Sequence, residues 1–426
     1  MKAEQMALDR LLDRAPQVRD MLSAYGRRVY FAKSGVLGQT WEAREKAYRF
    51  NATLGEAQAQ GKTIFSQTLQ ASLPGLQPEQ LYPYAKPAGI PELRACWKEK
   101  MLSQNPSMRA EALSLPVVTC GLTHALSITA ELFLDPGDPV VVHDKHWGNY
   151  EQIFEAHYGA KMYNYPTFAD GRFNLNGLRD TLAALPDHKA LVLLNFPNNP
   201  TGYCLTQKEA EDIAGVLKEE AERGRRMTVL VDDAYYGLWY DREAMRESLA
   251  GVLCGVHPNI LVVRVDGVTK EYFAGGFRVG FLTFMGQEAS VLGALEEKAA
   301  GAIRAFLSST SRPAQEMVLR GLKDKAFLRD MCAGAEILTR RGEYVLKRCR
   351  EGSPGGLWAP YPFRGGYFLC LRMQNAPAVR RILLDEYGIG VIVMNQTDLR
   401  ISFPCLEIEQ LETLFDLMDE AVRKAL

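Results

Sequence analysis

The chain has 426 residues, 47% of them hydrophobic and 24% charged, which is enough for two or three domains with buried cores. Its 50 lysines and arginines and 51 aspartates and glutamates leave a formal charge of −1, and this balance argues against nucleic acid or membrane as a partner. The eight cysteines form no Cys-x-x-Cys pair, and residues 1–19 lack the apolar core of a signal peptide. We therefore expect reduced thiols, no metal site and a cytoplasmic protein.

Apolar periodicity predicts helices over residues 1–50, and from residue 116 short apolar runs alternate with helix-period segments. The strands expected from these runs are 117–120, 139–142, 190–194, 228–231, 260–263 and 280–284. Continuous apolar strands separated by helices are typical of a parallel sheet covered on both faces. We predict an α/β fold whose large domain spans residues 55–315.

The pattern changes after residue 312 to that of a smaller α+β unit. It predicts a helix over 314–350 with an interruption near Gly321, then strands and a terminal helix. The expected later elements are strands 365–371, 391–393 and 399–403 and the helix 407–424. We predict a small C-terminal domain over residues 316–426, with residues 1–54 forming an N-terminal arm and part of that domain.

Polar residues and glycines follow the expected strands, where ligands bind in open α/β sheets. Gly121 and Thr123 open a helix whose free N–H groups and dipole favour a phosphate, although an ordinary cap by Thr123 is the commoner use of such a residue. Trp147 could stack on an aromatic ligand or pack in the core. Asn199 begins an Asn-Pro-Thr-Gly loop that is rigid enough to present its amide to a phenolic oxygen.

Two further strand ends carry charged groups. Asp232 ends a buried strand, where a carboxylate needs a cation, and a protonated pyridine nitrogen would supply one. Tyr235 follows three residues later and could reach the neighbouring phenolic oxygen. Lys270 offers an amine that can condense with an aldehyde, and Arg278 places a cation nearby for a phosphate. Together these groups favour pyridoxal 5'-phosphate as cofactor.

The motifs and their order resemble those of the fold-type I, class I aminotransferases of the aspartate aminotransferase superfamily. The segments that carry the resemblance are 84–94, 121–125, 147–149, 199–202, 232–235, 270–280 and 399–403. The resemblance implies a homodimer with shared active sites. It also implies ping-pong transfer of an amino group between an L-amino acid of aspartate, aromatic or alanine type and a 2-oxo acid.

The resemblance assigns a role to each matching position. Catalysis falls to Lys270, which would hold the cofactor and move the proton, together with Asp232 and Tyr235. The residues implied to bind the cofactor are Thr123 and Arg278 at the phosphate, Trp147 on the ring, Asn199 and Tyr235 at the phenolic oxygen, Asp232 at the ring nitrogen, Lys270 itself, and Tyr84 reaching the partner's phosphate. The residues implied to bind substrate are Arg400, Asn199, Trp147 and the backbone of Gly55, with Arg400 clamping the α-carboxylate as a bidentate pair.

Three positions depart from the family pattern. Gly267 stands where the family has a phosphate-binding serine, so that contact is missing or moved, for example to Thr269 or to a serine within 308–311. Tyr150 stands where aspartate-type members have a histidine, and its phenol could still donate to Asp232. Glu271 could be a surface charge, or it could raise the pKa of the adjacent lysine.

The substrate is not decided by these motifs. Arg304 and Arg312 lie where a partner chain's arginine could read a side-chain carboxylate, but neither falls in a motif that aligns securely. A C–S β-lyase or an amino-acid decarboxylase would use the same cofactor site. A non-catalytic regulatory sensor is disfavoured, since the first 50 residues are short and not basic.

Overall fold

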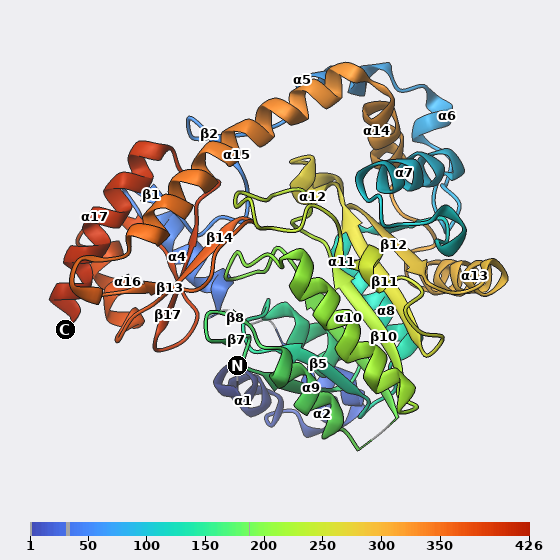
Figure 1. Cartoon of the computed structure of the whole chain (residues 1–426), viewed down its shortest axis with the longest axis horizontal. Coiled ribbons are helices and arrows are strands. Elements are labelled where there is room, and N and C mark those ends of the chain that lie inside the picture. The colour runs from blue at the N-terminus through green and yellow to red at the C-terminus, as the bar shows by residue number, and fades with distance from the viewer. Residues whose placement is uncertain (1, 31–34, 187) are drawn as a thin grey trace.

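The computed structural model describes residues 2–30, 35–186 and 188–426, and a seven-stranded sheet dominates it (Figure 1). The strand order is β4-β12-β11-β10-β9-β5-β6, with every neighbouring pair parallel except those that β12 makes. The strands are β4 (Val117–Cys120), β5 (Pro139–His143), β6 (Lys161–Tyr165), β9 (Lys189–Asn195), β10 (Arg226–Asp232), β11 (Ile260–Gly267) and β12 (Val279–Met285). The predicted mostly parallel sheet is confirmed.

Alternating strand residues point into two separate cores, as the period of two requires. Val118 and Val141 belong to one core, and Val117 and Val140 to the other. The first core is covered by α7 (Pro91–Gln104), α9 (Leu175–Ala183), α10 (Gln207–Glu222), α11 (Leu249–Leu253) and α14 (Arg312–Lys323). The second is covered by α8 (Gly121–Phe133), the π-helix η3 (Glu151–His157) and α13 (Ala289–Leu307). The sheet is therefore buried on both faces.

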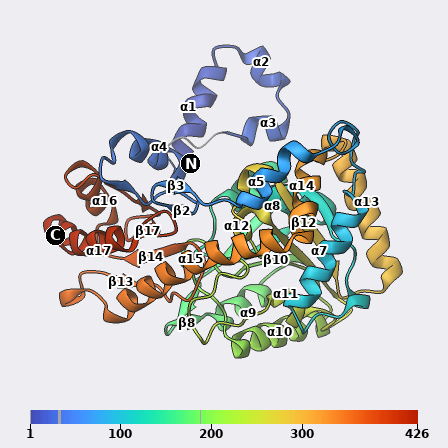
Figure 2. The same cartoon turned by 90° about the horizontal axis from the view of Figure 1, so that it is seen from above.

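A second, smaller unit is built on an antiparallel sheet with the order β13-β14-β17-β16. Its strands are β13 (Ala359–Pro360), β14 (Phe368–Arg372), β16 (Ile392–Val393) and β17 (Asp398–Ser402), and its helices are α16 (Ala376–Asp385) and α17 (Ile408–Ala425). The long helix α15 (Lys325–Glu351) runs from the large-sheet unit to this one (Figures 1 and 2). The predicted break near Gly321 falls at Asp324, whose carboxylate caps α15 at Ala326.

The N-terminal segment contributes to the smaller unit. Its strand β1 (Phe50–Asn51) pairs in parallel with β15 (Ile389–Gly390). The helices before it are α1 (Lys2–Leu12), α2 (Pro16–Met21), α3 (Ala24–Arg28) and α4 (Val36–Lys46). In Figure 2, α1 and α2 project from the body, whereas α3 packs on η3, where Tyr25 stacks on His157. Helices were predicted over residues 1–50, of which 1 and 31–34 lie outside the described residues.

The remaining elements are short. They are α5 (Gln67–Ser72), α6 (Pro78–Leu81), α12 (Val268–Glu271), the strands β2 (Gln58–Ala59), β3 (Lys62–Thr63), β7 (Phe168–Ala169) and β8 (Arg172–Phe173), and the 3-10 turns η1 (Leu73–Gly75), η2 (Ala110–Ala112), η4 (Gly275–Phe277) and η5 (Pro354–Gly356). None of the described helices carries an apolar stretch long enough to cross a bilayer. All eight cysteines are free, and only Cys332 is exposed.

Candidate active site

A cavity of about 330 Å³ lies beyond the carboxyl ends of the parallel strands, between the two units. Of the residues predicted to form the site, those that line it are Gly55, Thr123, Trp147, Asn199, Asp232, Tyr235, Lys270, Arg278 and Arg400. Tyr84 does not line it and is 86% exposed, so its role in a partner's site stays a prediction. Residues far apart in the sequence thus converge on one cavity.

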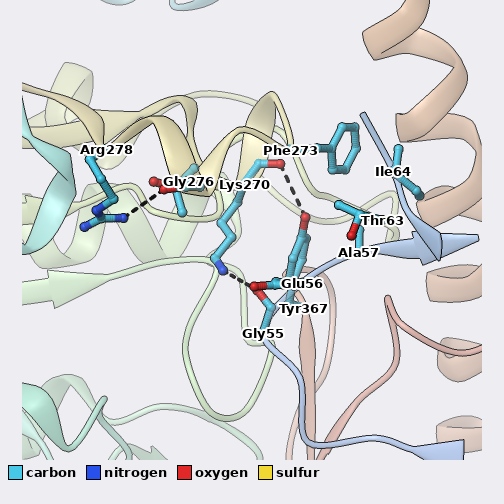
Figure 3. Close-up of a pocket in the computed structure, with 12 residues that line it drawn as sticks. Gly55, Glu56, Ala57, Thr63, Ile64, Lys270, Phe273, Gly276, Arg278 and Tyr367 are labelled. Carbon is cyan, nitrogen blue, oxygen red and sulfur yellow. Dashed lines mark hydrogen bonds between the residues drawn. The ribbon is translucent and has the colours of Figure 1, made fainter. Parts of the chain in front are cut away.

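Lys270 lies in the single turn of α12, directly after β11. Its amine points at the carbonyl oxygen of Gly55 and donates to it, while the hydroxyl of Tyr367 donates to the Lys270 carbonyl over 3.3 Å (Figure 3). Burial, with the positive charges of Arg400 and Arg278 and against the negative charge of Glu56, lowers the pKa of Lys270 to about 8. The neutral, nucleophilic form of the amine is therefore more populated near neutral pH than it is for an ordinary lysine.

Asp232 ends β10 at the floor of the cavity and is 3% exposed. The hydroxyl of Tyr150 donates to its Oδ2 over 2.5 Å, and the backbone N–H of Ala234 donates to Oδ1 over 3.0 Å. Burial nevertheless raises the pKa of Asp232 to about 6. The expected phenol contact from Tyr150 is confirmed, and no residue of the described chain forms an ion pair with this carboxylate.

Asn199 connects the two units of the molecule. Its Nδ2 lies 3.5 Å from the Tyr235 hydroxyl, and its Oδ1 accepts from the Arg400 guanidinium over 3.4 Å. The Asn199 N–H donates to Asn195 Oδ1 over 3.0 Å, and Asn195 in turn donates to the backbone of Asp232 over 2.8 Å. The side-chain amide of Asn199 therefore contacts Tyr235 through its nitrogen and Arg400 through its oxygen.

Arg400 lies on β17 and is 5% exposed. Its guanidinium carbon is 4.3 Å from the ring centre of Phe368, and within the described part of the chain its Nε has no hydrogen-bond partner. Burial lowers the pKa of Arg400 to about 10. A buried guanidinium without a carboxylate partner is suited to take an anion from solution.

The N-terminus of α8 and the Arg278 side chain form a cradle for an anion. An added Cβ on Gly121 would lie 2.5 Å from an Arg278 nitrogen, so the guanidinium lies directly against this backbone, whose φ of +75° favours glycine. Thr123 lies in the first turn but does not cap α8, which has no side-chain cap. The buried hydroxyl of Thr269 also lines the cavity and finds no partner among the described residues. These donors together can bind a phosphate.

The close packing of β11 against β12 explains why position 267 is a glycine. It pairs with Gly280 across β11 and β12, and a Cβ at position 267 would lie 2.8 Å from the Gly280 Cα and the Val279 oxygen. A serine therefore has no room here. Thr269, two residues on, supplies the free hydroxyl instead. Ser308 bonds to Arg304 and does not line the cavity.

Glu271 differs from both expectations. It forms an ion pair with Lys100, whose Nζ lies 2.8 Å from Oε1, and its side chain is only 16% exposed. The ion pair and the burial exclude a free surface charge. The carboxylate whose charge opposes the lowering of the Lys270 pKa is Glu56, not Glu271.

The arginines considered for a side-chain carboxylate are engaged elsewhere in their own chain. Arg304 donates to Ser308 over 3.0 Å, and Arg312 pairs with Glu316 over 3.4 Å. Sequence reasoning missed other cavity residues, chiefly Arg44 on α4 and Glu56. Periodicity could have placed Arg44 on a helix, but nothing local indicated which surface that helix covers.

The family model for aminotransferase class I and II matches residues 56–417. The chain belongs to this family. Among curated relatives, it is 31% identical over 204 residues to a probable N-acetyl-LL-diaminopimelate aminotransferase of Bacillus subtilis, covering 48% of each protein. It is 31% identical over 199 residues to the aspartate/prephenate aminotransferase of Thermus thermophilus, covering 46% of this chain and 47% of that one. The alignments thus span about half the length of these relatives.

Solved structures of aminotransferases share the fold. The superposition on an aminotransferase from Anaerococcus prevotii has a TM-score of 0.82 at 21% identity and covers 93% of this chain and 98% of that one. An alanine aminotransferase from Pyrococcus furiosus gives a TM-score of 0.76 at 21% identity, covering 95% and 100%. The family and the fold-type I architecture are thereby established, and the relatives' different names leave the substrate open.

Proposed function

We propose that the protein is a pyridoxal-phosphate-dependent aminotransferase that moves an amino group between an L-amino acid and a 2-oxo acid. The observation that carries the proposal is the convergence of Lys270, Asp232 and Arg400 on one cavity. The groups this chemistry needs are an amine of lowered pKa, a buried carboxylate and a buried guanidinium, and none of the three forms an ion pair within the described residues.

The residues present fit the cofactor. The Thr269 hydroxyl is buried without a partner among the described residues, and the Arg278 guanidinium lies against Gly121 at the N-terminus of α8, an arrangement that suits a phosphate. Asp232 would face the ring nitrogen, and Asn199 and Tyr235 would hold the phenolic oxygen. Bound there, the cofactor supplies an electron sink for the bonds at the substrate's α-carbon.

The chain's own groups would then bind the substrate and move its protons. Arg400 would hold the α-carboxylate in a bidentate pair, with Asn199 steadying the guanidinium. The Lys270 amine would accept and return the proton at the α-carbon, because its lowered pKa lets it act as a base near neutral pH. Tyr150 would keep the Asp232 carboxylate oriented through its 2.5 Å hydrogen bond.

A half-reaction tests this proposal. The protein loaded with pyridoxal phosphate is mixed with single amino acids, and conversion of the cofactor to pyridoxamine phosphate is followed by absorbance while the 2-oxo acid is identified. Release of pyruvate and ammonia without pyridoxamine phosphate would overturn it in favour of a lyase. Lys270→Ala should abolish turnover, whereas Lys298→Ala, an exposed lysine of α13, should leave it unchanged.

A homodimer with shared sites belongs to the same proposal, through the exposed Tyr84. Tyr84→Phe should weaken cofactor binding if the hydroxyl reaches a partner's phosphate. Sedimentation of the purified protein would show the oligomeric state.

A further inference from the structure

The reactive amine of the candidate site is carried by a helix of one turn. α12 spans only Val268–Glu271, and the segment after it is irregular, with Phe273 and Arg278 at positive φ values of 53° and 54°. A single helical turn fixes several backbone angles for one hydrogen bond and is unstable alone. Contacts from outside the turn must therefore hold the backbone of Lys270 in place.

Glu271, the residue after the lysine, fastens this turn to α7. The Nζ of Lys100 lies 2.8 Å from Oε1 of Glu271 and 2.9 Å from Oε2, so it bonds to both oxygens. Gln104, one turn further along α7, donates to Oε1 over 3.4 Å. Successive residues of a helix point about 100° apart. A Glu271 side chain held against α7 therefore leaves Lys270 free to point into the cavity, which it lines.

Lys100 is itself held by two aromatic rings. Its Nζ lies 4.3 Å from the ring centre of Trp97 and 5.4 Å from that of Tyr272, which follows Glu271 in the chain. Trp97 is fully buried, and its indole N–H donates to both carboxylate oxygens of Asp266 over 3.1 Å. The Lys100 ammonium thus contacts two rings and a carboxylate, which restricts it to one position.

The smaller unit makes a second contact with the lysine. The hydroxyl of Tyr367 donates to the Lys270 carbonyl over 3.3 Å, and the tyrosine is only 1% exposed (Figure 3). Tyr367 directly precedes β14 of the smaller unit. The short helix α12 is therefore fixed from both units of the molecule, through Glu271 by α7 and through its own carbonyl by Tyr367.

We propose that Lys100 and Glu271 are positioning residues, whose ion pair orients α12 so that the Lys270 amine points into the cavity. The inference rests on the proposed function, since it concerns the group that would move the proton at the α-carbon. Neither side chain is among the described residues that line the cavity, so the pair acts through the backbone. Without Lys100, the Glu271 carboxylate would lose its cation and turn towards water, and the single turn would move with it.

Lys100→Met tests the inference in the protein loaded with pyridoxal phosphate. The amino donor is whichever of L-aspartate, L-alanine and L-phenylalanine the wild type converts fastest in the half-reaction. The maximal rate should fall about 10- to 100-fold, the cost of displacing a reacting group by about 1 Å, while the half-saturating concentration changes by less than about twofold. The substrate contact through Arg400 is left intact. Lys100→Arg, which keeps a cation beside Trp97 and Glu271, should retain most of the wild-type rate.

Hydrogen exchange in the cofactor-free protein gives a second readout that needs no turnover. The backbone N–H groups of Tyr272 and Ala274 donate to the Val268 carbonyl, both over 3.2 Å. Mass spectrometry of a peptide covering residues 268–274 should show about tenfold faster exchange in Lys100→Met than in wild type, because the turn opens locally. Peptides from β9 and β10 should exchange at the wild-type rate.

Lys98→Met is the matched control, because it removes a lysine from the same helix without touching α12. The Nζ of Lys98 donates to the Leu113 carbonyl over 2.6 Å. Its loss should change neither the half-reaction nor the exchange of residues 268–274. Glu271→Gln is a second test variant, which keeps the side-chain shape and an acceptor for Lys100 and is expected to fold even where Lys100→Met does not. Its maximal rate should fall about three- to tenfold, since a hydrogen bond to a neutral amide is about half as strong as one to a carboxylate.

An unchanged maximal rate in either folded variant would overturn the inference. So would a lower rate accompanied by equally faster exchange in β9 and β10, which would indicate a general loss of stability and not a displaced turn. If the wild type converts no amino acid, the proposed function fails. Faster exchange confined to residues 268–274 would then still show that the ion pair holds α12 in place.

Discussion

A buried ion pair between Lys145 and Asp398 connects the large-sheet unit to the smaller unit beside the candidate site. The Nζ of Lys145 lies 2.9 Å from Oδ2 of Asp398, and the two side chains are 18% and 1% exposed. Lys145 lies two residues before Trp147 in the large-sheet unit, and Asp398 lies two residues before Arg400 on β17. The pair thus joins the loop that carries the indole to the strand that carries the guanidinium.

Lys145→Met should destabilise the protein by about 3 kcal/mol. Removing one partner of a buried ion pair costs about 3–5 kcal/mol, because the other charge stays buried without compensation. The lower end applies since Tyr361 and Asn395 continue to donate to the Asp398 carboxylate, over 2.9 and 2.8 Å. Free energies of unfolding from urea titrations at pH 7 measure the loss.

Lys189→Met is the matched control for that experiment. Lys189 pairs with Asp138 over 2.5 Å, but its side chain is 43% exposed, so losing the pair should cost at most about 1 kcal/mol. Adding Asp398→Asn to Lys145→Met should recover part of the loss, since no buried charge is then left unpaired. Equal losses for Lys145→Met and Lys189→Met would refute the reasoning. So would a double variant whose loss is the sum of its two single losses.

Two further predictions concern the segment around the lysine. Gly267→Ser should destabilise the protein by about 1–3 kcal/mol, because its Cβ would press on the Gly280 and Val279 backbone. Gly293→Ser, in open space on α13, should leave the stability unchanged. The midpoints of urea unfolding of the two variants measure this difference. In the protein without cofactor, the Lys270 pKa of about 8 lies below its ordinary 10.5, so the unfolded chain binds more protons between these values and stability rises with pH across that window. Lys270→Met should therefore be more stable than wild type at pH 7, and the difference should shrink toward pH 10.5; a constant difference would contradict the shift.

The parts of the site that lie at strand ends could be predicted from the sequence. Asp232 ends, and Asn199 follows, an apolar run typical of a buried strand, and parallel strands bring their carboxyl ends to one edge. Lys270 is found the same way, since it comes directly after β11. Local order along the chain is enough to bring such residues together.

Other features depend on contacts that no local pattern reveals. The edge strand β6 reads Lys-Met-Tyr-Asn-Tyr and only Tyr165 of it is buried, so it lacks the apolar run that marks the inner strands. The absence of a serine at Gly267 follows from the close approach of Gly280 across the sheet. Likewise the ion pair of Glu271 with Lys100 joins the short helix α12 to α7, which lies far away in the sequence. Each of these needs the tertiary packing before it can be stated.

The direction of the pKa shifts distinguishes charged groups that stabilise the fold through an ion pair from charged groups suited to bind a ligand. Hydrogen bonds and charge from Asp398 and Asp144 outweigh burial and raise the pKa of Lys145, so the pair is stabilised in its charged form. Burial instead lowers the pKa of Lys270 and of Arg400 and raises that of Asp232, so all three are shifted toward their uncharged forms. No described residue forms an ion pair with Asp232, Lys270 or Arg400, although all three line one cavity. Ligands that bring a cation to Asp232 and an anion to Arg400 would stabilise the charged forms of these two groups. This complementarity is the physical reason to expect a cofactor and an amino acid in the cavity.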